Sequence, residues 1–447
     1  MGASASTSID TAEVRLAKHS WPPGAIEKRG DLPALTGLRF FAAAFIFVGH
    51  ATLFIIKLDP SPQLLINVTN CFLEVGMQLF FVLSGFVIHY NYANVGRPPH
   101  AQSLAKFYIA RFARIYPLYL LFIAIQLVSN GPDLRSLPFF LGLTQSWVYI
   151  VIRGVPLIGR LNALGTWTIS TEWFFYCLYP LIAWLVAMTL YRLTTALALT
   201  AVALLGLVLA IVIFQHSLEV NAFALAMWGK PAGDLFFVWL LAFSPVGRLP
   251  PFLIGIATAH IFVGRYHQKV GESEERLATA FLTLALLCAA VMCGFQSRGS
   301  AFASSLALFV YPLSIAVVIF CCARYRSPVS RSLSVPLLII GGNASYSIYL
   351  FHPLILEFTR VQGELAWTWF NISYVGVRFA VTALITIIFS AIMYRIFEAP
   401  ARAATRRQLG RSVDEAAGRN RYLLPVALCV GIPVALTIFG WFISLRS

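Results

Sequence analysis

The amino-acid sequence predicts an all-α, polytopic membrane protein, a helical bundle of about ten core transmembrane helices plus one extra helix at the C-terminus. Only 11% of the 447 residues are charged and 59% are hydrophobic, whereas soluble domains carry about 25% charged residues. Apolar stretches of about 20 residues, the length that crosses a bilayer, recur along the chain. Arginines and lysines gather in the connections between these stretches.

The apolar stretches that could span a membrane follow one another along nearly the whole chain. They lie near residues 34–56, 71–92, 107–129, 166–188, 193–214, 235–264, 277–296, 301–323, 335–359, 372–397 and 422–444. A further stretch, 137–152, is doubtful as a span because it is shorter than the others.

The basic residues predict the orientation, because Lys and Arg concentrate in cytoplasmic loops. The tail before the first stretch carries basic residues, so we expect a cytoplasmic N-terminus; they are Arg15, Lys18, Lys28 and Arg29. Four later connections are also basic, namely 93–114, 265–276, 324–334 and 398–421. All four lie on the cytoplasmic side only if an even number of crossings precedes each of them.

Two arrangements satisfy this parity. In one, 137–152 is re-entrant and ten spans precede the last basic connection. In the other, 235–264 is a hairpin broken at its Ser-Pro and Pro-Pro pairs, which gives twelve spans. We favour ten, because each half of such a hairpin would be short. In either case 422–444 adds one crossing, which places the C-terminus outside the cytoplasm.

Four regions are therefore expected. They are a polar cytoplasmic tail (1–32), a membrane domain (33–400), a basic cytoplasmic linker (401–421) and an additional C-terminal transmembrane helix (422–447). The tail lacks the apolar core of a cleaved signal peptide. The net charge of +15 is explained by basic loops, so no nucleic-acid partner is expected. The seven cysteines form no CxxC pair, and we predict buried thiols without a metal site.

Two ionisable residues, Arg39 and His50, lie in the first apolar stretch, where such residues are costly and mark functional sites. They are eleven residues apart, close to three helical turns, so they share one face, with roughly 16 Å between them along the helix axis. Arg39 alone could be an anchor at the membrane interface, and His50 alone could be a packing hydrogen bonder. Together they favour one continuous polar path.

Other polar groups interrupt later stretches. Ser84 precedes Gly85, where small residues permit close helix packing. Arg111 and Arg114 share a helix face at the cytoplasmic entrance, either as anchors or as a phosphate clamp. Glu172 lies about one turn into an aromatic helix, where it could complement the helix N-terminus or take part in proton handling or substrate binding.

The last two polar segments lie in the C-terminal half. Ser345, Tyr349 and His352 follow i, i+4, i+7 spacing and should line one polar helix face. Glu398 precedes Ala399 and Pro400 at a helix end, where an acid is unfavourable unless a cation meets it. Arg39 or a nearby arginine could be that cation.

In their order, these segments resemble the membrane acyltransferase type 3 family of bacterial O-acyltransferases, over roughly residues 31–400. The marks of the resemblance are Arg39 with ten residues before His50, the Ser-Gly segment at Phe80–Phe86, the helix start at Arg111, Arg114 and Pro117, Trp167 with Glu172, Arg248 with Phe252 and Gly255, the run from Ser345 to His352, and Glu398-Ala399-Pro400. Each mark alone is weak, but the ordered set is specific.

The resemblance implies about ten helices around a pore in a bacterial inner membrane. It also implies that an acyl group, expected to be acetyl, passes from cytoplasmic acyl-coenzyme A (acyl-CoA) to a hydroxyl group of a carbohydrate or glycolipid acceptor such as an exopolysaccharide or O-antigen. The form expected is the stand-alone one, without a fused SGNH hydrolase-like domain.

The site residues follow from the resemblance and the polar segments. We expect Arg39, Arg111 and Arg114 to hold the phosphates of acyl-CoA. The expected catalytic residues are His50, Glu172 and His352. Substrate contacts are expected from Trp167, Ser170, Ser345 and Tyr349. Structural motif roles are expected for Ser84, Glu398 and Pro400.

The hypothetical mechanism has a neutral His50 acting as general base on the acceptor hydroxyl. Glu172 could orient or neutralise His50 or bind sugar hydroxyls, and a covalent acyl-enzyme is a competing route. A proton-coupled transporter of a small polar solute is the alternative function, because intramembrane acids and histidines also form proton relays. Transporters commonly contain internal repeats, and none is found in this sequence.

Overall fold

A computed structural model describes the chain in nine stretches. The described residues are 30–56, 63–95, 101–131, 133–162, 165–189, 192–228, 236–361, 375–414 and 426–445. The predicted cytoplasmic tail therefore lies almost wholly outside the described residues, as does part of the predicted linker at 401–421.

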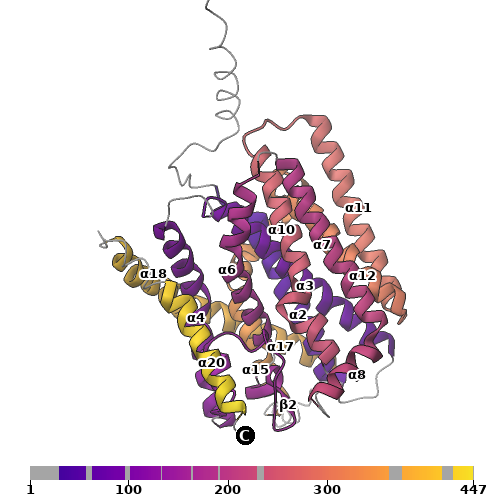
Figure 1. Ribbon diagram of the computed structural model, residues 1–447. Helices are drawn as coiled ribbons and strands as arrows, with labels where there is room; N and C mark the ends of the chain where they lie inside the picture. The colour runs from indigo at the N-terminus through magenta and orange to yellow at the C-terminus, as the bar shows by residue number, and fades with distance from the viewer. Residues whose placement is uncertain are drawn as a thin grey trace, which may run out of the picture.

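The described chain is almost entirely helical, as predicted (Figure 1). Its α-helices are α2 (Pro33–Ile56), α3 (Gln63–Tyr92), α4 (Ala101–Asn130), α5 (Leu137–Leu141), α6 (Thr166–Ala187), α7 (Arg192–Gln215), α8 (Ser217–Trp228), α10 (Pro245–Arg265), α11 (Glu272–Gln296), α12 (Ala301–Arg324), α13 (Pro328–Leu333), α14 (Pro336–Asn343), α15 (Ser345–Val361), α17 (Val375–Met393), α18 (Ala399–Asp414) and α20 (Ile432–Leu445). Short elements complete it: strands β1 (Val151–Ile152) and β2 (Val155–Pro156), a 3-10 helix (Leu157–Asn162), and π-helical turns at Trp239–Phe243, Tyr394–Glu398 and Ala427–Gly431.

Within the described residues, nine helical segments are long and apolar enough to cross a membrane. They are Pro33–Leu53, Gln63–Tyr92, Gln102–Ser129, Thr166–Ala187, Leu193–Gln215, Phe236–Arg265, Glu272–Gln296, Phe302–Arg324 and Gly376–Arg411. The predicted span at 335–359 is divided at Ala344 into α14 and α15, so neither half reaches the length of the nine. Counted with that broken segment as one crossing, these helices would give the ten core spans of the arrangement favoured above.

The structure shows how the two segments that distinguish the ten-span from the twelve-span arrangement, 137–152 and 235–264, are folded. The stretch 137–152 contains only the five-residue helix α5, followed by turns and a short antiparallel hairpin, so it is not a spanning helix. The stretch 235–264 is not a hairpin, because α10 alone is 21 residues long and crosses once after a kink at Ser244. Both findings agree with the ten-span arrangement.

The basic connections meet at one end of the bundle. The Tyr90 hydroxyl donates to the carbonyl of Gly30 at 2.9 Å, and the Tyr90 ring packs on Tyr266. Arg324 donates to the carbonyl of Arg265 at 2.6 Å, which joins the connections after α10 and α12. We refer to this end as the basic end. It contains the connections that charge parity assigns to one side.

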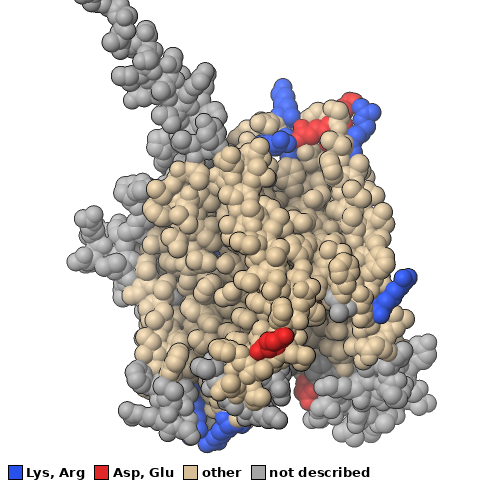
Figure 2. Space-filling view, turned by 45° about the vertical axis from the view of Figure 1, so that its right-hand side comes forward, with Lys and Arg blue, Asp and Glu red and all other residues tan. Residues whose placement is uncertain are grey.

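The described charges on the face in Figure 2 lie at the top of the view and in its lower half, with an uncharged band between them. Helix α7 contributes to this band, since Leu197, Val202 and Leu205 are all exposed. Exposed leucine and valine in such number suit lipid rather than water. The chain is thus a multi-pass membrane protein.

Helices α3 and α10 cross at two reciprocal glycines. A Cβ atom placed on Gly85 would lie 2.1 Å from the carbonyl oxygen of Phe252, and one on Gly255 would lie 2.1 Å from that of Val82. Small residues let helix backbones approach closely in membranes. The sequence prediction for Gly85, close packing, is therefore correct. The crossing fixes α3, which carries several residues of the site described below.

A buried ion pair reinforces the same crossing nearer the other end. Arg248 on α10 donates to Glu74 on α3 at 3.0 Å and to the carbonyl of Ala242 at 2.8 Å. The Gln78 amide donates to Glu74 at 2.6 Å, and the Arg248 guanidinium lies over the ring of Trp167. Trp167, at the start of α6, is therefore held by the α3–α10 pair.

We expect Gly85→Ala to lower the free energy of unfolding by about 1–3 kcal/mol, because the added methyl group would force two backbones apart. The control is Gly294→Ala, since no atom lies within 4 Å of a Cβ placed at Gly294 on α11. Thermal denaturation of both variants in detergent measures the difference. Equal unfolding midpoints would contradict the close crossing.

Candidate active site

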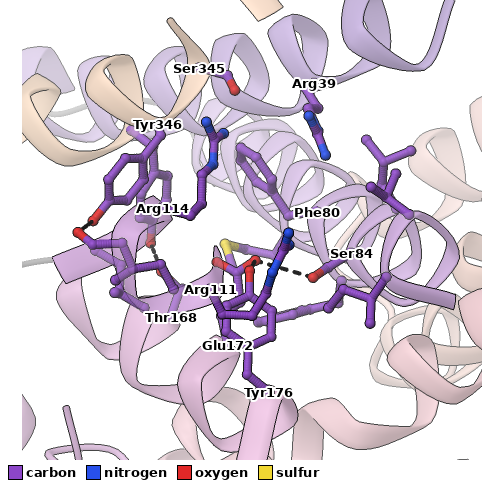
Figure 3. Close-up of a pocket in the computed structure, with 18 residues that line it drawn as sticks. Arg39, Phe80, Ser84, Arg111, Arg114, Thr168, Glu172, Tyr176, Ser345 and Tyr346 are labelled. Atoms are coloured by element: carbon purple, nitrogen blue, oxygen red, sulfur yellow. Dashed lines mark hydrogen bonds between the residues drawn. The ribbon is translucent and has the colours of Figure 1, made fainter. Parts of the chain in front are cut away.

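A cavity near the basic end is enclosed by α2, α3, α4, α6 and α15 (Figure 3). It contains about 840 Å³ of atom-free space, part of it open to solvent. Its lining combines apolar side chains with three arginines, one carboxylate and several hydroxyls: Arg39, Met77, Phe80, Phe81, Leu83, Ser84, Val87, Ile88, Arg111, Arg114, Ile115, Thr168, Ile169, Glu172, Tyr176, Ser345, Tyr346 and Tyr349. Five helices, some of them far apart in the sequence, thus place their predicted site residues around one space.

Glu172 is the carboxylate of this cavity, and two hydroxyl groups hold it. The Ser84 hydroxyl donates to Glu172 Oε1 at 3.1 Å, and the Tyr176 hydroxyl donates to the same oxygen from one turn further along α6. Ser84 was expected to permit close helix packing, and its side chain also lines the cavity, where it holds Glu172. These two hydrogen bonds hold the carboxylate so that it faces the arginines (Figure 3).

Arg111 is held by aromatic rings. Its guanidinium donates to the Tyr92 hydroxyl at 3.1 Å and lies 4.8 Å from the centre of that ring and 5.5 Å from the centre of Tyr176. Its Nε is buried without a partner among the described residues. Arg111 is therefore oriented, yet retains a donor that a ligand could use.

Arg39 and Arg114 differ in how they are neutralised. Arg114 forms an ion pair with Glu398 at 3.2 Å, and the Ser347 hydroxyl donates to the other oxygen of that carboxylate at 2.6 Å. Arg114, rather than Arg39, is thus the cation that meets the acid at the helix end. No described residue accepts a hydrogen bond from Arg39, whose nearest charged neighbours are Arg114, Glu172 and Arg111. Arg39 is accordingly the cation most available to an anionic ligand.

The predicted polar face of α15 is present. Ser345 and Tyr349 both line the cavity, and His352 follows one turn later. The Tyr349 hydroxyl donates to the carbonyl of Gly165 at 2.7 Å and contacts the Thr168 hydroxyl. Gly165 has φ +94°, a conformation that favours glycine, and it begins α6 at this point. Tyr349 therefore connects the cavity wall to the start of α6.

His50 and His352 form a stacked pair beyond Tyr349. His50 Nδ1 lies 2.9 Å from His352 Nε2, and the ring centres are 5.1 Å apart at an interplanar angle of 17°. His352 Nδ1 lies 2.7 Å from the carbonyl oxygen of Tyr349, and the side chain is fully buried. The two histidines are 302 residues apart in the sequence.

This pairing corrects one sequence hypothesis. Glu172 was considered as a group that orients or neutralises His50, but its bonds go to Ser84 and Tyr176, and the partner of His50 is His352. The cavity and the histidine pair are adjacent through Tyr349, whose ring centre lies 5.9 Å from that of His352. Arg39 lines the cavity, whereas His50 lies outside it, in the histidine pair.

Besides the two histidines and Glu398, three predicted residues lie outside the cavity lining. Ser170 is fully buried and bonds to the carbonyl of Leu143 at 2.8 Å and to Ser146, so it holds the 137–152 segment against α6. Trp167 packs under Arg248. Pro400 lies in the first turn of α18, directly after the π-helical turn that contains Glu398. None of the three lines the cavity in this conformation.

Some site residues escaped the sequence analysis. Tyr176 could have been found, since it stands four residues after Glu172 on one helix face. Tyr92 and Tyr346 contact Arg111 and Arg114 from other helices. No local pattern distinguishes them from other aromatic residues in apolar stretches.

Sequence comparison agrees with this architecture. The family model of an acyltransferase domain matches residues 32–395, most of the chain, and covers the bundle, the cavity and the histidine pair. The protein is therefore a membrane-embedded acyltransferase. It belongs to the membrane acyltransferase type 3 family.

Two relatives illustrate the similarity. The chain is 25% identical to acyltransferase MdmB from Streptomyces mycarofaciens over 395 residues, which are 85% of this chain and 93% of the relative. It is 38% identical to protein 2 in the picA locus of Rhizobium radiobacter over 94 residues, 21% of this chain and 42% of that protein. No solved structure matches this chain.

We expect Glu398→Gln to destabilise the protein by about 1–3 kcal/mol, because it removes the charge that compensates Arg114 in a largely buried pair. The double variant Arg114→Gln/Glu398→Gln should lose less than the sum of the two single variants. Thermal denaturation of the three variants in detergent provides the cycle. Arg395→Gln, an exposed change in the same π-helical turn, is the control. Strict additivity would rule out a direct pair.

Proposed function

We propose that this acyltransferase transfers an acyl group, expected to be acetyl, from cytoplasmic acyl-CoA to a hydroxyl group of a carbohydrate or glycolipid acceptor, with His50 as general base. The observation that carries the proposal is the His50–His352 pair, adjacent to a cavity that contains three arginines. The family assignment supplies acyl transfer, and the residues below supply the proposed roles.

The hydrogen bonds of the pair select a tautomer of His50. A carbonyl oxygen only accepts, so the Tyr349 carbonyl requires a hydrogen on His352 Nδ1. In an uncharged His352 ring, Nε2 then carries the lone pair and accepts from His50 Nδ1–H. His50 Nε2 is left with its own lone pair. An oriented imidazole with a free lone pair is the arrangement that a general base needs.

The proposed chemistry is a direct displacement. His50 Nε2 takes the proton of the acceptor hydroxyl as its oxygen attacks the thioester carbonyl carbon. The carbon–sulfur bond then breaks, and the coenzyme A thiolate receives the proton from His50. His352 acts as a positioning residue, because it keeps the hydrogen on the other nitrogen of His50. Acyl-imidazole formation on His50 is the competing covalent route.

The donor side of the proposal depends on the cavity. Guanidinium groups suit phosphates, which they bind with paired hydrogen bonds. Arg39 has no described hydrogen-bond partner, and Arg111 keeps a buried Nε without one. We assign both to the diphosphate of acyl-CoA, with Arg114 beside them. The pantetheine arm would then run along α2, over the roughly 16 Å of helix from Arg39 to His50.

The acceptor side rests on the family resemblance. Carbohydrate hydroxyls would reach His50 from the end opposite to the donor, near the end of α2. Ser345 and Tyr349 contribute hydroxyl groups between the two substrates, and Trp167 contributes a ring near the start of α6. With the donor in the cytoplasm, the basic end faces the cytoplasm, in a bacterial inner membrane.

We expect His50→Ala to lower kcat about 10²- to 10⁴-fold, the usual effect of losing a general base. His352→Ala should lower kcat about 10- to 100-fold with an unchanged KM for acetyl-CoA, because an orienting partner is lost. Release of the coenzyme A thiol in membranes that contain the acceptor measures both. His216→Ala changes an exposed histidine and is the control.

Full acylation by a normally inserted His50→Ala protein would falsify the general-base role. Incubation with labelled acetyl-CoA in the absence of acceptor tests the competing route. Label that stays bound to the protein, and is lost in His50→Ala, would replace direct displacement by an acyl-enzyme.

We expect Arg39→Lys to raise the KM for acetyl-CoA about tenfold, because lysine cannot form the paired bonds of a guanidinium group. Arg298→Lys, at an exposed position after α11, should leave it unchanged. Initial rates at varied acetyl-CoA concentration provide the measurement. An Arg39→Lys enzyme with wild-type KM would make Arg39 an interface anchor.

Mass spectrometry of surface glycans from cells with and without the gene identifies the acceptor. A gene-dependent increment of one acetyl group, about 42 mass units, on a glycan is expected. Solute uptake into vesicles that lack coenzyme A, without any acyl increment, would instead favour the transporter alternative.

A further inference from the structure

A second group of arginines lies on α18, outside the cavity. Arg402, Arg406 and Arg407, with Ala399 and Ala403, line one side of α18 beside a shallow hollow, whose atom-free space of about 770 Å³ includes open solvent. No carboxylate in the described part of the chain forms an ion pair with these three arginines. We call them the α18 arginines. Three positive charges therefore lie close together on α18, and no carboxylate among the described residues neutralises them.

The α18 arginines continue outward from the cavity wall. Glu398, the residue before α18, bonds to Arg114 on α4 and Ser347 on α15, and both helices line the cavity. Further along, Leu409 packs against Ala105 and Ile109 near the beginning of α4. Helix α18 therefore runs along α4 from Arg114 toward the basic end, as Figure 1 shows at its left edge.

Helical geometry places these arginines one after another along α18, at increasing distance from Glu398. Arg402 follows Glu398 by one turn and Arg406 by two, about 6 Å and 12 Å along the axis. In coenzyme A the diphosphate separates the pantetheine arm from the ribose with its 3′-phosphate. If the diphosphate lies at Arg39 and Arg111, with Arg114 beside them, the 3′-phosphate extends away from His50, in the direction of α18.

The balance of charge between the cavity and the donor phosphates also favours a phosphate site on α18. The cavity arginines Arg39, Arg111 and Arg114 supply three positive charges, and Glu172 and Glu398 return two negative ones, which leaves one. The diphosphate carries about two negative charges and a phosphomonoester another 1.5 to 2. The cavity therefore compensates only part of the donor. The three α18 arginines supply the remaining positive charge.

We propose that the α18 arginines form a phosphate-binding subsite that holds the 3′-phosphate of coenzyme A, and this assignment rests on the proposed function. Guanidinium groups in adjacent turns offer the paired hydrogen bonds that a phosphomonoester accepts. A phospholipid headgroup presents the same phosphate chemistry. The position of α18, leading away from Arg114, assigns the subsite to the donor rather than to lipid.

The test compares coenzyme A with dephospho-coenzyme A, which lacks only the 3′-phosphate. Equilibrium binding of both to the purified full chain in neutral phosphatidylcholine nanodiscs should favour coenzyme A about 10- to 100-fold. In Arg402→Gln/Arg406→Gln this preference should disappear, while dephospho-coenzyme A binds as to the wild type. Glutamine keeps a good helix former at both positions.

Arg411→Gln is the matched control, an exposed arginine on α18 that does not line the hollow, and it should keep the preference. A double variant that keeps the preference overturns the subsite. So does a wild type that binds both compounds equally, although the donor assignment would survive. A wild-type protein that does not bind coenzyme A overturns the donor assignment and the subsite together. A double variant that changes only the binding of phosphatidylglycerol-containing vesicles assigns α18 to lipid.

Discussion

Compensation of buried charge by a partner on another helix is the interaction on which this bundle depends. A charged group removed from water is costly unless a counter-charge and hydrogen bonds meet it. Glu398 meets Arg114 and Ser347, and so fixes α18 against α4 and α15. Arg248 and Glu74 do the same for α10 and α3 at the other end of the site. Helices that carry the cavity arginines are thereby held in register with those that carry the histidines.

Hydropathy and charge predicted most of the architecture. Nine of the eleven predicted spans match described helical segments that are long and apolar enough to cross a membrane, because lipid imposes length and apolarity on each helix independently of its neighbours. The parity of the basic connections left two arrangements open, and the short helix α5 agrees with the ten-span arrangement that we favoured. Helical spacing predicted that Ser345 and Tyr349 share a face. These properties are local, so a single sequence contains them.

The partners of the polar residues could not be predicted, because they depend on which helices touch. Nothing local indicates that His352, rather than Glu172, meets His50 across 302 residues. Ser170 was expected at the substrate, yet it faces the segment after α5, since only the packed structure decides which side of α6 is interior. The break between α14 and α15 was also missed, because the apolar pattern continues through Ala344.

The π-helical turn at Tyr394–Glu398 has a consequence for insertions and deletions. Such a turn holds one residue more than an α-helical turn. Removing a single residue there would restore a regular helix and leave everything after it at nearly the same rotation relative to α17, whereas a removal elsewhere in the helix would rotate the following residues by about 100°. The arginines of α18 would then keep their neighbours. Homologous chains that differ by one residue at this turn should therefore conserve the orientation of α18 rather than the residue count.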